Sequence, residues 1–180
     1  MNHQIWPERK GAFQIAGQDV TLIGNEVRIG DQAPEFIAQT QDWQPIPILA
    51  STEVKVRILA AVPSLNTSVC DRETRRFNEE ASALSEDIAI IVISMDLPYA
   101  QKQWCGAAGV DRVLVVSDQM EADFGKKYGC LIKERRILRR SVFVVDRKGK
   151  ITYAAYMPEQ GQEPDYLAVI HAAKDALMAQ

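Results

Sequence analysis

Residues 56–78 read VRILAAVPSLNTSVCDRETRRFN, and this stretch decides which fold the chain can adopt. Its first part, Val56 to Val62, is a continuous apolar run rich in β-branched residues, which is typical of a strand covered on both faces. Pro63 ends that strand, and a helical pattern begins a few residues later. A buried strand that leads through a short turn into a helix is a building unit of α/β folds.

Similar units follow along the chain. The predicted strands are Val56–Val62, Ile88–Ser94, Val113–Val116, Ser141–Asp146 and 151–156, and the predicted helices are Asp71–Leu84, the short segment 97–105 and Asp165–Ala179. The two longer helices are predicted from apolar residues at helical spacing, and the short one from Asp96 and Pro98 at its start. The order β-α-β-α-β and then ββα predicts an α/β fold, with a mixed central sheet and helices on both faces.

The segment before the first buried strand has a different pattern of apolar and polar residues. Phe13 to Ile29 contains short alternating stretches, and Gly17 and the pair Gly24-Asn25 can supply the positive φ angles of tight turns. This pattern predicts an N-terminal β-hairpin at about residues 13–29. The following residues up to Leu49 contain too many prolines for a central strand. Since no linker divides the 180 residues, we expect a single domain over residues 1–180.

Composition excludes several classes of protein. With 47% hydrophobic and 25% charged residues, the chain is neither disordered nor collagenous. A net charge of -3 disfavours nucleic acid or an anionic membrane as a partner. No apolar run approaches the roughly 20 residues of a membrane-spanning helix, and the first residues lack the apolar stretch of a signal peptide. We therefore expect a cytoplasmic protein.

Cys70 has the strongest chemical signal of the three cysteines. Asn66, Thr67 and Ser68 are all suitable N-cap residues, and Ser68 with Asp71 has the spacing of a capping box, so Cys70 falls in the first turn of a helix. The helix dipole and free N–H groups stabilise a thiolate there. Nearby Arg72, Arg75 and Arg76 add positive charge, although Asp71 and Glu73 oppose it. The alternative, a buried inert cysteine, is the commonest fate of a lone Cys, but this context favours a reactive thiol.

The other two cysteines have different settings. Cys105 lies at the end of a predicted helix that Gly106 and Gly109 terminate, where the negative pole of the dipole disfavours a thiolate. It could still attack a more electrophilic partner, or it could simply pack beside Trp104. Cys130 has no signature and is predicted to be a core residue.

The positions of the histidines and cysteines give little support for a metal or cofactor site. His3 and His171 lie near opposite ends of the chain, and the cysteines are dozens of residues apart, unlike the close pairs of zinc sites. We therefore expect neither a metal nor another cofactor. The sequence also lacks a CxxC motif, which excludes a thioredoxin or disulfide isomerase.

Residues 63–70, PSLNTSVC, match the peroxiredoxin pattern P-x-x-x-T-x-x-C. Further matching segments are GDQAPEF, VPSLNTSVCDRETRRFN, SMDLPYAQKQWCGAAG, YGCLIK and RRSVFVVD. On these motifs the chain resembles the thiol peroxidases, the atypical two-cysteine peroxiredoxins of bacteria. The resemblance implies a thioredoxin-like fold with an added N-terminal hairpin. It also implies that Cys70 is the peroxidatic thiol and Cys105 the resolving thiol, with Pro63, Thr67 and Arg140 completing the peroxide pocket.

The same resemblance implies a reaction and its partners. Cys70 would reduce alkyl hydroperoxides and hydrogen peroxide and become a sulfenic acid, an intrachain Cys70–Cys105 disulfide would follow, and thioredoxin would restore the thiols. A homodimer is also expected. An apolar rim is predicted to bind the organic part of the peroxide, formed by Leu65, Val69, Tyr99 and Trp104. Arg140 is expected to be partly exposed, so that its removal would change activity more than stability.

Two other functions remain open at this stage. A non-catalytic thioredoxin-fold redox sensor or switch could use the same two thiols, because sensor and peroxidase share the first oxidation step. The number of turnovers distinguishes the two functions, because a peroxidase consumes many equivalents of peroxide and a switch stops after one. A glutathione-dependent enzyme is a weaker alternative, since Cys105 offers an internal resolving thiol.

Overall fold

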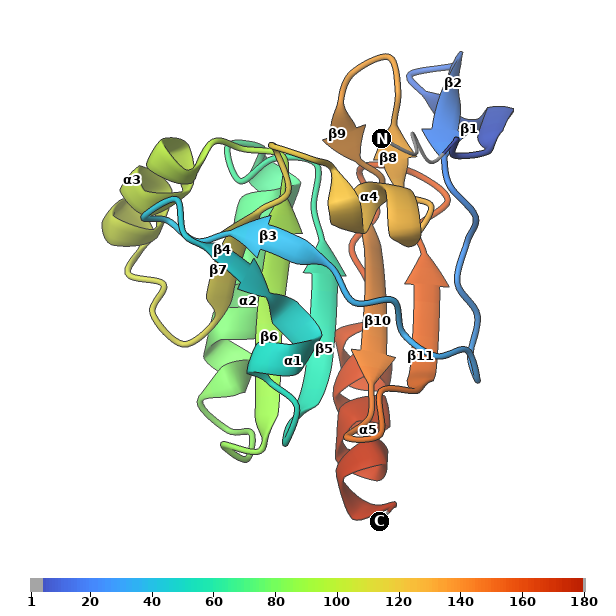
Figure 1. Cartoon of the computed structure of the whole chain (residues 1–180). Helices are drawn as coiled ribbons and strands as arrows, with labels where there is room; N and C mark the ends of the chain where they lie inside the picture. The colour runs from blue at the N-terminus through green and yellow to red at the C-terminus, as the bar shows by residue number, and fades with distance from the viewer. Residues whose placement is uncertain (1–4, 180) are drawn as a thin grey trace.

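The computed structural model describes residues 5–179. Its larger sheet has seven strands in the order β11-β10-β5-β6-β7-β3-β4 (Figure 1). The central strands β5, β6 and β7 are parallel, and the outer strands pair antiparallel to their neighbours. The bounds are β3 Ile37–Gln39, β4 Pro45–Pro47, β5 Val56–Ala61, β6 Ile88–Ser94, β7 Leu114–Ser117, β10 Ser141–Val145 and β11 Ile151–Tyr156. The predicted mixed sheet is confirmed, and the proline-rich segment forms the edge strand β4, as prolines require.

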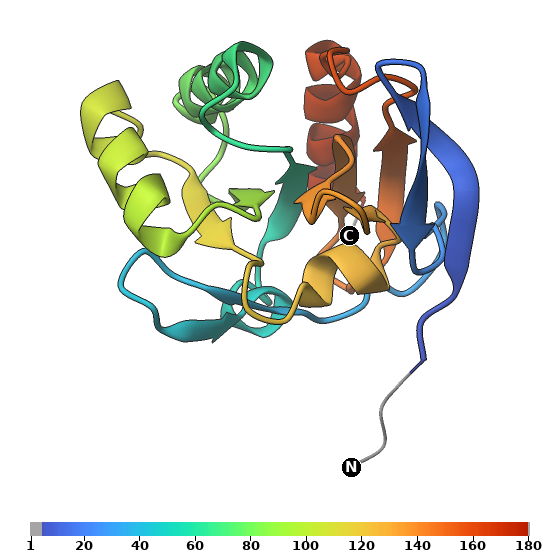
Figure 2. The same cartoon turned by 90° about the horizontal axis from the view of Figure 1, so that it is seen from above.

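Helices cover both faces of this sheet. Figure 2 shows α2, α3 and α5 on one side and the short α1 and α4 on the other. Their bounds are α1 Ile48–Ser51, α2 Ser68–Ala81, α3 Pro98–Ala108, α4 Asp123–Lys127 and α5 Tyr166–Met178. None of these helices of the described chain is long and apolar enough to cross a membrane.

The alternation of side chains along β5 explains why the sheet needs both helical layers. All six residues of β5 are buried. Ile58 and Ala60 belong to the core beneath α2, α3 and α5, whereas Leu59 and Ala61 belong to the core on the opposite face. Because successive strand residues point to opposite faces, a strand that is apolar at every position is stable only between two layers.

A smaller antiparallel sheet contains the N-terminal hairpin. Its order is β1-β2-β8-β9, and the bounds are β1 Glu8–Ile15, β2 Gln18–Ile23, β8 Leu131–Ile132 and β9 Ile137–Leu138. Ala16 and Gly17, with φ angles of 52° and 76°, form the hairpin turn. The predicted hairpin at 13–29 is therefore correct in type but displaced, since it begins at Glu8 and ends at Ile23. Charged residues are tolerated in β1 because it is an edge strand, and this obscured its start.

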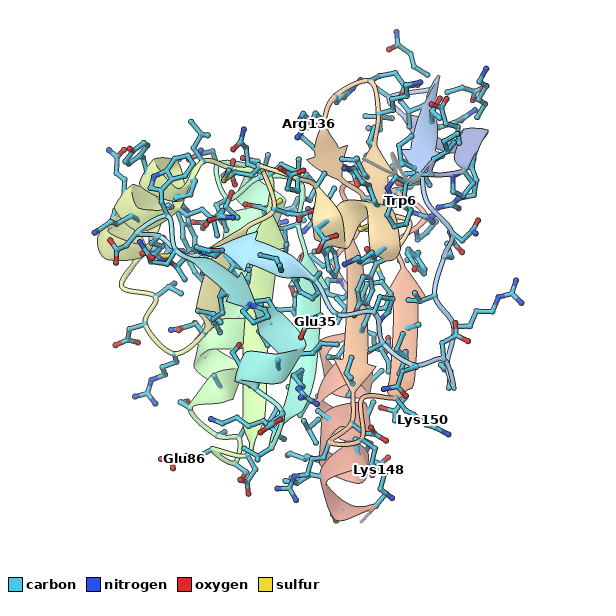
Figure 3. All side chains as sticks on the ribbon, in the orientation of Figure 1. Trp6, Glu35, Glu86, Arg136, Lys148 and Lys150 are labelled. Carbon is cyan, nitrogen blue, oxygen red and sulfur yellow. The ribbon has the colours of Figure 1, made fainter. Side chains whose placement is uncertain are left out.

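Trp6, which precedes β1, and Glu35, which precedes β3, attach the segments around them to the larger sheet and its helices (Figure 3). Trp6 packs against the core on the α1 and α4 side. Glu35 lies beside α1, where its carboxylate accepts hydrogen bonds from the N–H groups of Leu49 and Ala50 at 2.8 and 2.7 Å. These N–H groups have no partner within such a short helix, so Glu35 satisfies them.

Gly24 is the position where the backbone approaches another segment most closely. It has a φ of +86°, and a Cβ there would lie 1.8 Å from the carbonyl oxygen of Lys126. Gly17 also has a positive φ, of +76°, but a Cβ there would meet no atom within 4 Å. Gly24 thus does not turn a hairpin, as the sequence suggested, but lets β2 pass against the end of α4.

This difference yields a prediction for a matched pair of variants. Gly17→Ala should cost about 1–2 kcal/mol, the strain of a left-handed residue with a side chain. Gly24→Ala should cost clearly more, because the strain is joined by a clash with backbone that cannot rotate away. Urea denaturation of the two variants measures both values, and equal losses would contradict the close approach at Gly24.

Candidate active site

Cys70 lies in the first turn of α2, as the sequence predicted. Thr67 is the N-cap residue: its backbone is extended, and its hydroxyl oxygen accepts a hydrogen bond from the N–H of Cys70 at 3.4 Å. Ser68 is already helical, so the predicted capping box of Ser68 and Asp71 is wrong. The cap one residue earlier leaves Cys70 within the same turn, where unpaired N–H groups favour an anion.

The sulfur of Cys70 has two polar neighbours. Thr67 Oγ1 lies 2.7 Å from Cys70 Sγ, and Arg140 Nη2 donates a hydrogen bond to it at 3.2 Å. Thr67 Oγ1 also lies 3.1 Å from the carbonyl oxygen of Ser64, so its single proton can serve either acceptor. Cys70 itself is buried while Thr67 is exposed, which places the sulfur directly beneath the surface.

Arg140 is buried, with only 1% of its surface exposed. The expectation of a partly exposed Arg140 is therefore wrong. Its Nε donates to the carbonyl oxygen of Gln160 at 3.0 Å, and its Nη1 forms an ion pair with Glu73. Burial alone would lower the pKa of Arg140, but Glu73 and Cys70 raise it above its ordinary value. The guanidinium is thus a permanent positive charge that binds the sulfur through one nitrogen and a carboxylate through another.

The arginines of α2 do not have this role. Arg72, Arg75 and Arg76, which the sequence suggested as local positive charges, form ion pairs on the outside of the helix with Glu163, Asp71 and Glu80, respectively. Each of these side chains is about half exposed. Their charges are screened by water and partnered by carboxylates, whereas Arg140 is in hydrogen-bond contact with the sulfur of Cys70.

The sequence suggested Glu73 only as a negative charge near Cys70 and did not reveal its burial or its pairing with Arg140. Glu73 is fully buried on the same face of α2 as Cys70 and Phe77, at the spacing i, i+3, i+7. An acidic residue on the apolar face of a helix is unusual, and this was the signal that could have revealed it. Burial raises the pKa of Glu73 from 4.5 to about 7, although the charge of Arg140 acts in the opposite direction.

The loop before α2 is held by a second carboxylate, which the sequence suggested only as part of the start of the helix 97–105. Asp96, after β6, accepts hydrogen bonds from the hydroxyl of Ser64 at 2.7 Å and from the N–H of Leu65 at 2.8 Å. Pro63 is buried where the loop leaves β5. The first part of the loop is thus anchored, and the N–H of Thr67 donates to the carbonyl oxygen of Ser64 in this anchored part at 3.1 Å.

Cys105 lies near the C-terminus of α3, as predicted, with Gly109 as the left-handed C-cap; Gly106 lies within the helix and does not end it. Gln41 donates a hydrogen bond to its sulfur at 3.4 Å. Burial raises the pKa of the Cys105 thiol, partly offset by Gln41. The residue borders a surface hollow of about 560 Å³ next to Lys102. Cys70, Cys105 and Cys130 are all free thiols.

The four predicted rim residues have different surroundings. Leu65 is fully buried and packs in the same core cluster as Cys70, with Trp104 partly buried against that cluster. Val69 is half-buried beside Cys70 in α2. Tyr99 is 69% exposed and packs against Trp43, with 5.2 Å between ring centroids. Contact of these residues with a peroxide remains a prediction.

The remaining candidates have no place in this cluster. Cys130 is completely buried, and burial raises the pKa of its thiol. His171 is exposed on α5, and His3 lies outside the described residues. Within residues 5–179, no group of three or more His, Cys, Asp and Glu side chains is arranged to hold a metal ion.

Comparison with known proteins identifies the family. The model of the Redoxin family matches residues 28–170. The chain is 51% identical over 151 residues to the thiol peroxidase of Oceanobacillus iheyensis, a match that covers 84% of this chain and 91% of that protein. The chain belongs to the thiol peroxidases of the redoxin family. It is therefore a peroxiredoxin, an enzyme that uses a thiol to reduce peroxides.

Further relatives agree with this assignment. The thiol peroxidase of Bacillus subtilis is 49% identical over 158 residues, with 88% of this chain and 93% of that protein covered. A peroxiredoxin-like protein from Aquifex aeolicus superposes with a TM-score of 0.83 at 36% identity, over 96% of this chain and 99% of that one. The predicted thioredoxin-like peroxiredoxin fold is thus confirmed for this enzyme.

The buried carboxyl of Glu73 predicts a pH dependence of stability. Its folded-state pKa, about 7, lies above the ordinary 4.5, so its contribution to stability is fully present below pH 4.5 and is lost as the pH rises through 7. Because a glutamine side chain does not ionise, Glu73→Gln should not show this loss of stability at high pH. The difference in Tm, variant minus wild type, should therefore become more positive from about pH 5 to pH 8.

Thermal denaturation across this pH range measures the effect. Glu80→Gln is the matched control, because it removes a carboxylate from the half-exposed side of the same helix. A Tm difference for Glu73→Gln that stays as flat as that of the control would contradict the assignment.

Proposed function

We propose that this peroxiredoxin reduces alkyl hydroperoxides and hydrogen peroxide through the sulfur of Cys70. The observation that supports this most directly is the pair of contacts at Cys70 Sγ, from Thr67 Oγ1 at 2.7 Å and Arg140 Nη2 at 3.2 Å. A cation and a hydroxyl beside a sulfur at a helix N-terminus stabilise the thiolate, which is the nucleophilic form. Within residues 5–179, neither Cys105 nor Cys130 has a cation in hydrogen-bond contact with its sulfur.

In the first step, the thiolate of Cys70 attacks one oxygen of R–O–O–H. The S–O bond forms as the O–O bond breaks, and the departing alkoxide takes up a proton to become the alcohol ROH. Cys70 is left as a sulfenic acid, oxidised by two electrons. Negative charge moves from sulfur to the departing oxygen during this step, so fixed donors next to both atoms accelerate it.

Arg140 and Thr67 are the donors we assign to this step. Arg140 stays charged and is held by Glu73 and Gln160, so it needs no reorganisation when the charge moves. The hydroxyl of Thr67 can turn its proton from the Ser64 carbonyl toward a peroxide oxygen. Pro63 has no N–H group to offer and shields the sulfur from water on the β5 side.

Cys105 then resolves the sulfenic acid. Its thiol condenses with Cys70–SOH to form an intrachain disulfide and water, which protects Cys70 from further oxidation. A dithiol carrier of the thioredoxin type reduces this disulfide by exchange, which returns both thiols. A hydroperoxide, thioredoxin and a second copy of the chain in a homodimer are the proposed partners.

The substrate preference follows from the side chains near the start of α2. Val69 and Trp104 are only partly buried and are apolar, so they can cover the organic group of an alkyl hydroperoxide. Tyr99 is exposed at the start of α3 and can extend this rim, whereas Leu65 would join it only if the loop moves, because Leu65 is fully buried in this conformation. We therefore expect a higher kcat/KM for cumene hydroperoxide than for hydrogen peroxide.

A coupled assay with thioredoxin, thioredoxin reductase and NADPH tests the proposed function. The wild type should consume many equivalents of cumene hydroperoxide per chain, whereas Cys70→Ser should consume none. Peptide mapping without reductant should find a Cys70–Cys105 disulfide and leave Cys130 reduced. Consumption that stops after one equivalent would indicate a redox switch instead, and a main bridge to Cys130 would exclude the proposed resolving thiol.

Arg140→Ala should affect both activity and stability. Loss of one preorganised donor is expected to lower kcat/KM by about 10²-fold. Leaving Glu73 buried without its partner should also cost roughly 3–5 kcal/mol of stability. Arg140→Lys keeps the positive charge but cannot bind Glu73 and Cys70 through separate nitrogens. It should therefore be more stable than Arg140→Ala and still lose activity relative to the wild type.

Arg139→Ala provides the control for this prediction. The side chain of Arg139 binds Glu26 at 3.0 Å and lies over the ring of Phe13 at 4.8 Å, away from Cys70. Steady-state kinetics and urea denaturation compare the variants. Activity of Arg140→Ala within about threefold of wild type, together with a large loss in Arg139→Ala, would assign the functional cation to Arg139.

A further inference from the structure

The two helices that carry Cys70 and Cys105 are joined by a polar contact next to both cysteines. Trp104 Nε1 in α3 donates a hydrogen bond to Asp71 Oδ1 in α2 at 3.1 Å. Asp71 follows Cys70 directly in the chain, and Trp104 directly precedes Cys105. This contact therefore links the neighbours of the two thiols that the proposed function requires to meet.

Arg75 reinforces the contact from the second turn of α2. Its Nε forms an ion pair with Asp71 Oδ2 at 2.9 Å, and its Nη1 donates to the carbonyl oxygen of Ala108 near the end of α3 at 3.0 Å. Its guanidinium also lies over the Trp104 ring, 5.7 Å from the centroid. We refer to Asp71, Arg75 and Trp104 as the clasp.

The clasp holds the cysteines in an arrangement without a disulfide. The sulfur of Cys70 contacts Thr67 and Arg140, whereas that of Cys105 contacts Gln41. A disulfide needs the two Cα atoms within about 7 Å and the Cβ atoms turned toward each other, so each sulfur must leave its present partners.

Movement of either cysteine opens the clasp. Asp71 shares the first turn of α2 with Cys70 and donates its N–H to the carbonyl oxygen of Thr67 at 2.9 Å. If this turn unwinds, Asp71 moves with Cys70 and its bonds to Arg75 and Trp104 break. A shift of the last turns of α3 moves Trp104 together with Cys105 and breaks the same bonds.

We propose that Asp71, Arg75 and Trp104 are positioning residues that set how the Cys70 sulfenic acid is partitioned between two reactions. The proposal rests on the proposed function. In one reaction, the Cys105 thiol condenses with Cys70–SOH to give a disulfide and water. In the other, a second hydroperoxide oxidises Cys70–SOH to the sulfinic acid and is itself reduced to the alcohol. Because the clasp stabilises the arrangement in which the thiols are apart, it slows the first reaction and leaves time for the second.

Two variants weaken the clasp in different ways. Arg75→Gln removes the ion pair with Asp71, and Trp104→Phe keeps an aromatic ring but removes the N–H donor. The matched control is Arg76→Gln, because Arg76 forms a similar ion pair with Glu80 at 2.6 Å on the same helix and lies over the ring of Tyr166, and both of these partners lie outside α3.

The experiment treats the reduced enzyme with a series of cumene hydroperoxide concentrations in the absence of reductant. Mass spectrometry of the acid-quenched protein counts the sulfinic acid and the disulfide. Both products arise from the same sulfenic acid, so an altered first step does not change their ratio. Arg75→Gln, at a residue outside the proposed rim, separates the clasp from any role of Trp104 in binding the second hydroperoxide. Each clasp variant should lower the ratio of sulfinic acid to disulfide by about fivefold, the factor associated with one hydrogen bond, and Arg76→Gln should leave it unchanged.

The outcomes distinguish a positioning role of the clasp from a purely structural one. A purely structural role would lower the Tm of Arg75→Gln and Trp104→Phe while leaving the ratio at the wild-type value, and this would overturn the proposal. An increased ratio would overturn it as well. If the wild type itself forms no Cys70–Cys105 disulfide, the proposed function fails together with the clasp; if it does and only the variants behave as wild type, the clasp alone fails.

Discussion

The buried ion pair between Arg140 and Glu73 is the interaction on which the rest of the site depends. The guanidinium of Arg140 is only 1% exposed, and without a partner its buried charge would strongly destabilise the fold. Glu73, about one turn after Cys70 in α2, compensates this charge. The remaining face of the guanidinium is then free to bind the sulfur of Cys70. One guanidinium thus contacts both the carboxyl group of Glu73 and the sulfur of Cys70, the atom that the proposed reaction oxidises.

The sheet explains why Arg140 is in reach of residues 70 positions away. Ser141, the first residue of β10, pairs with Ala61, the last residue of β5. Arg140 is therefore next to the point where the chain leaves β5 for the loop before α2. Because β10 and β5 are neighbouring, fully buried strands, this register cannot slip without turning apolar side chains to the wrong face. The position of the cation is thus set by the packing of the core.

Opposing demands meet at the start of α2. The proposed first step needs a rigid arrangement of Cys70, Thr67 and Arg140, and the hydrogen bonds of Asp96 to the preceding loop contribute to it. The proposed second step needs the same turn to move. The hydrogen bonds between α2 and α3 are exposed or only partly buried, whereas apolar contacts hold α5 against the sheet. Polar contacts of this kind are weak enough to open while the core remains intact.

Local chemistry was enough to predict much of this enzyme from its sequence. Apolar runs such as Ile88–Ser94 define buried strands by themselves, and cap residues before Cys70 place it at a helix N-terminus, because strand burial and capping depend on near neighbours in the chain. The displaced hairpin, the cap at Thr67, the burial of Arg140 and the role of Glu73 were decided only by the tertiary structure. Whether an arginine is solvated or buried depends on which distant carboxylate meets it, and that is determined by strand order and register, which neither periodicity nor composition encodes locally.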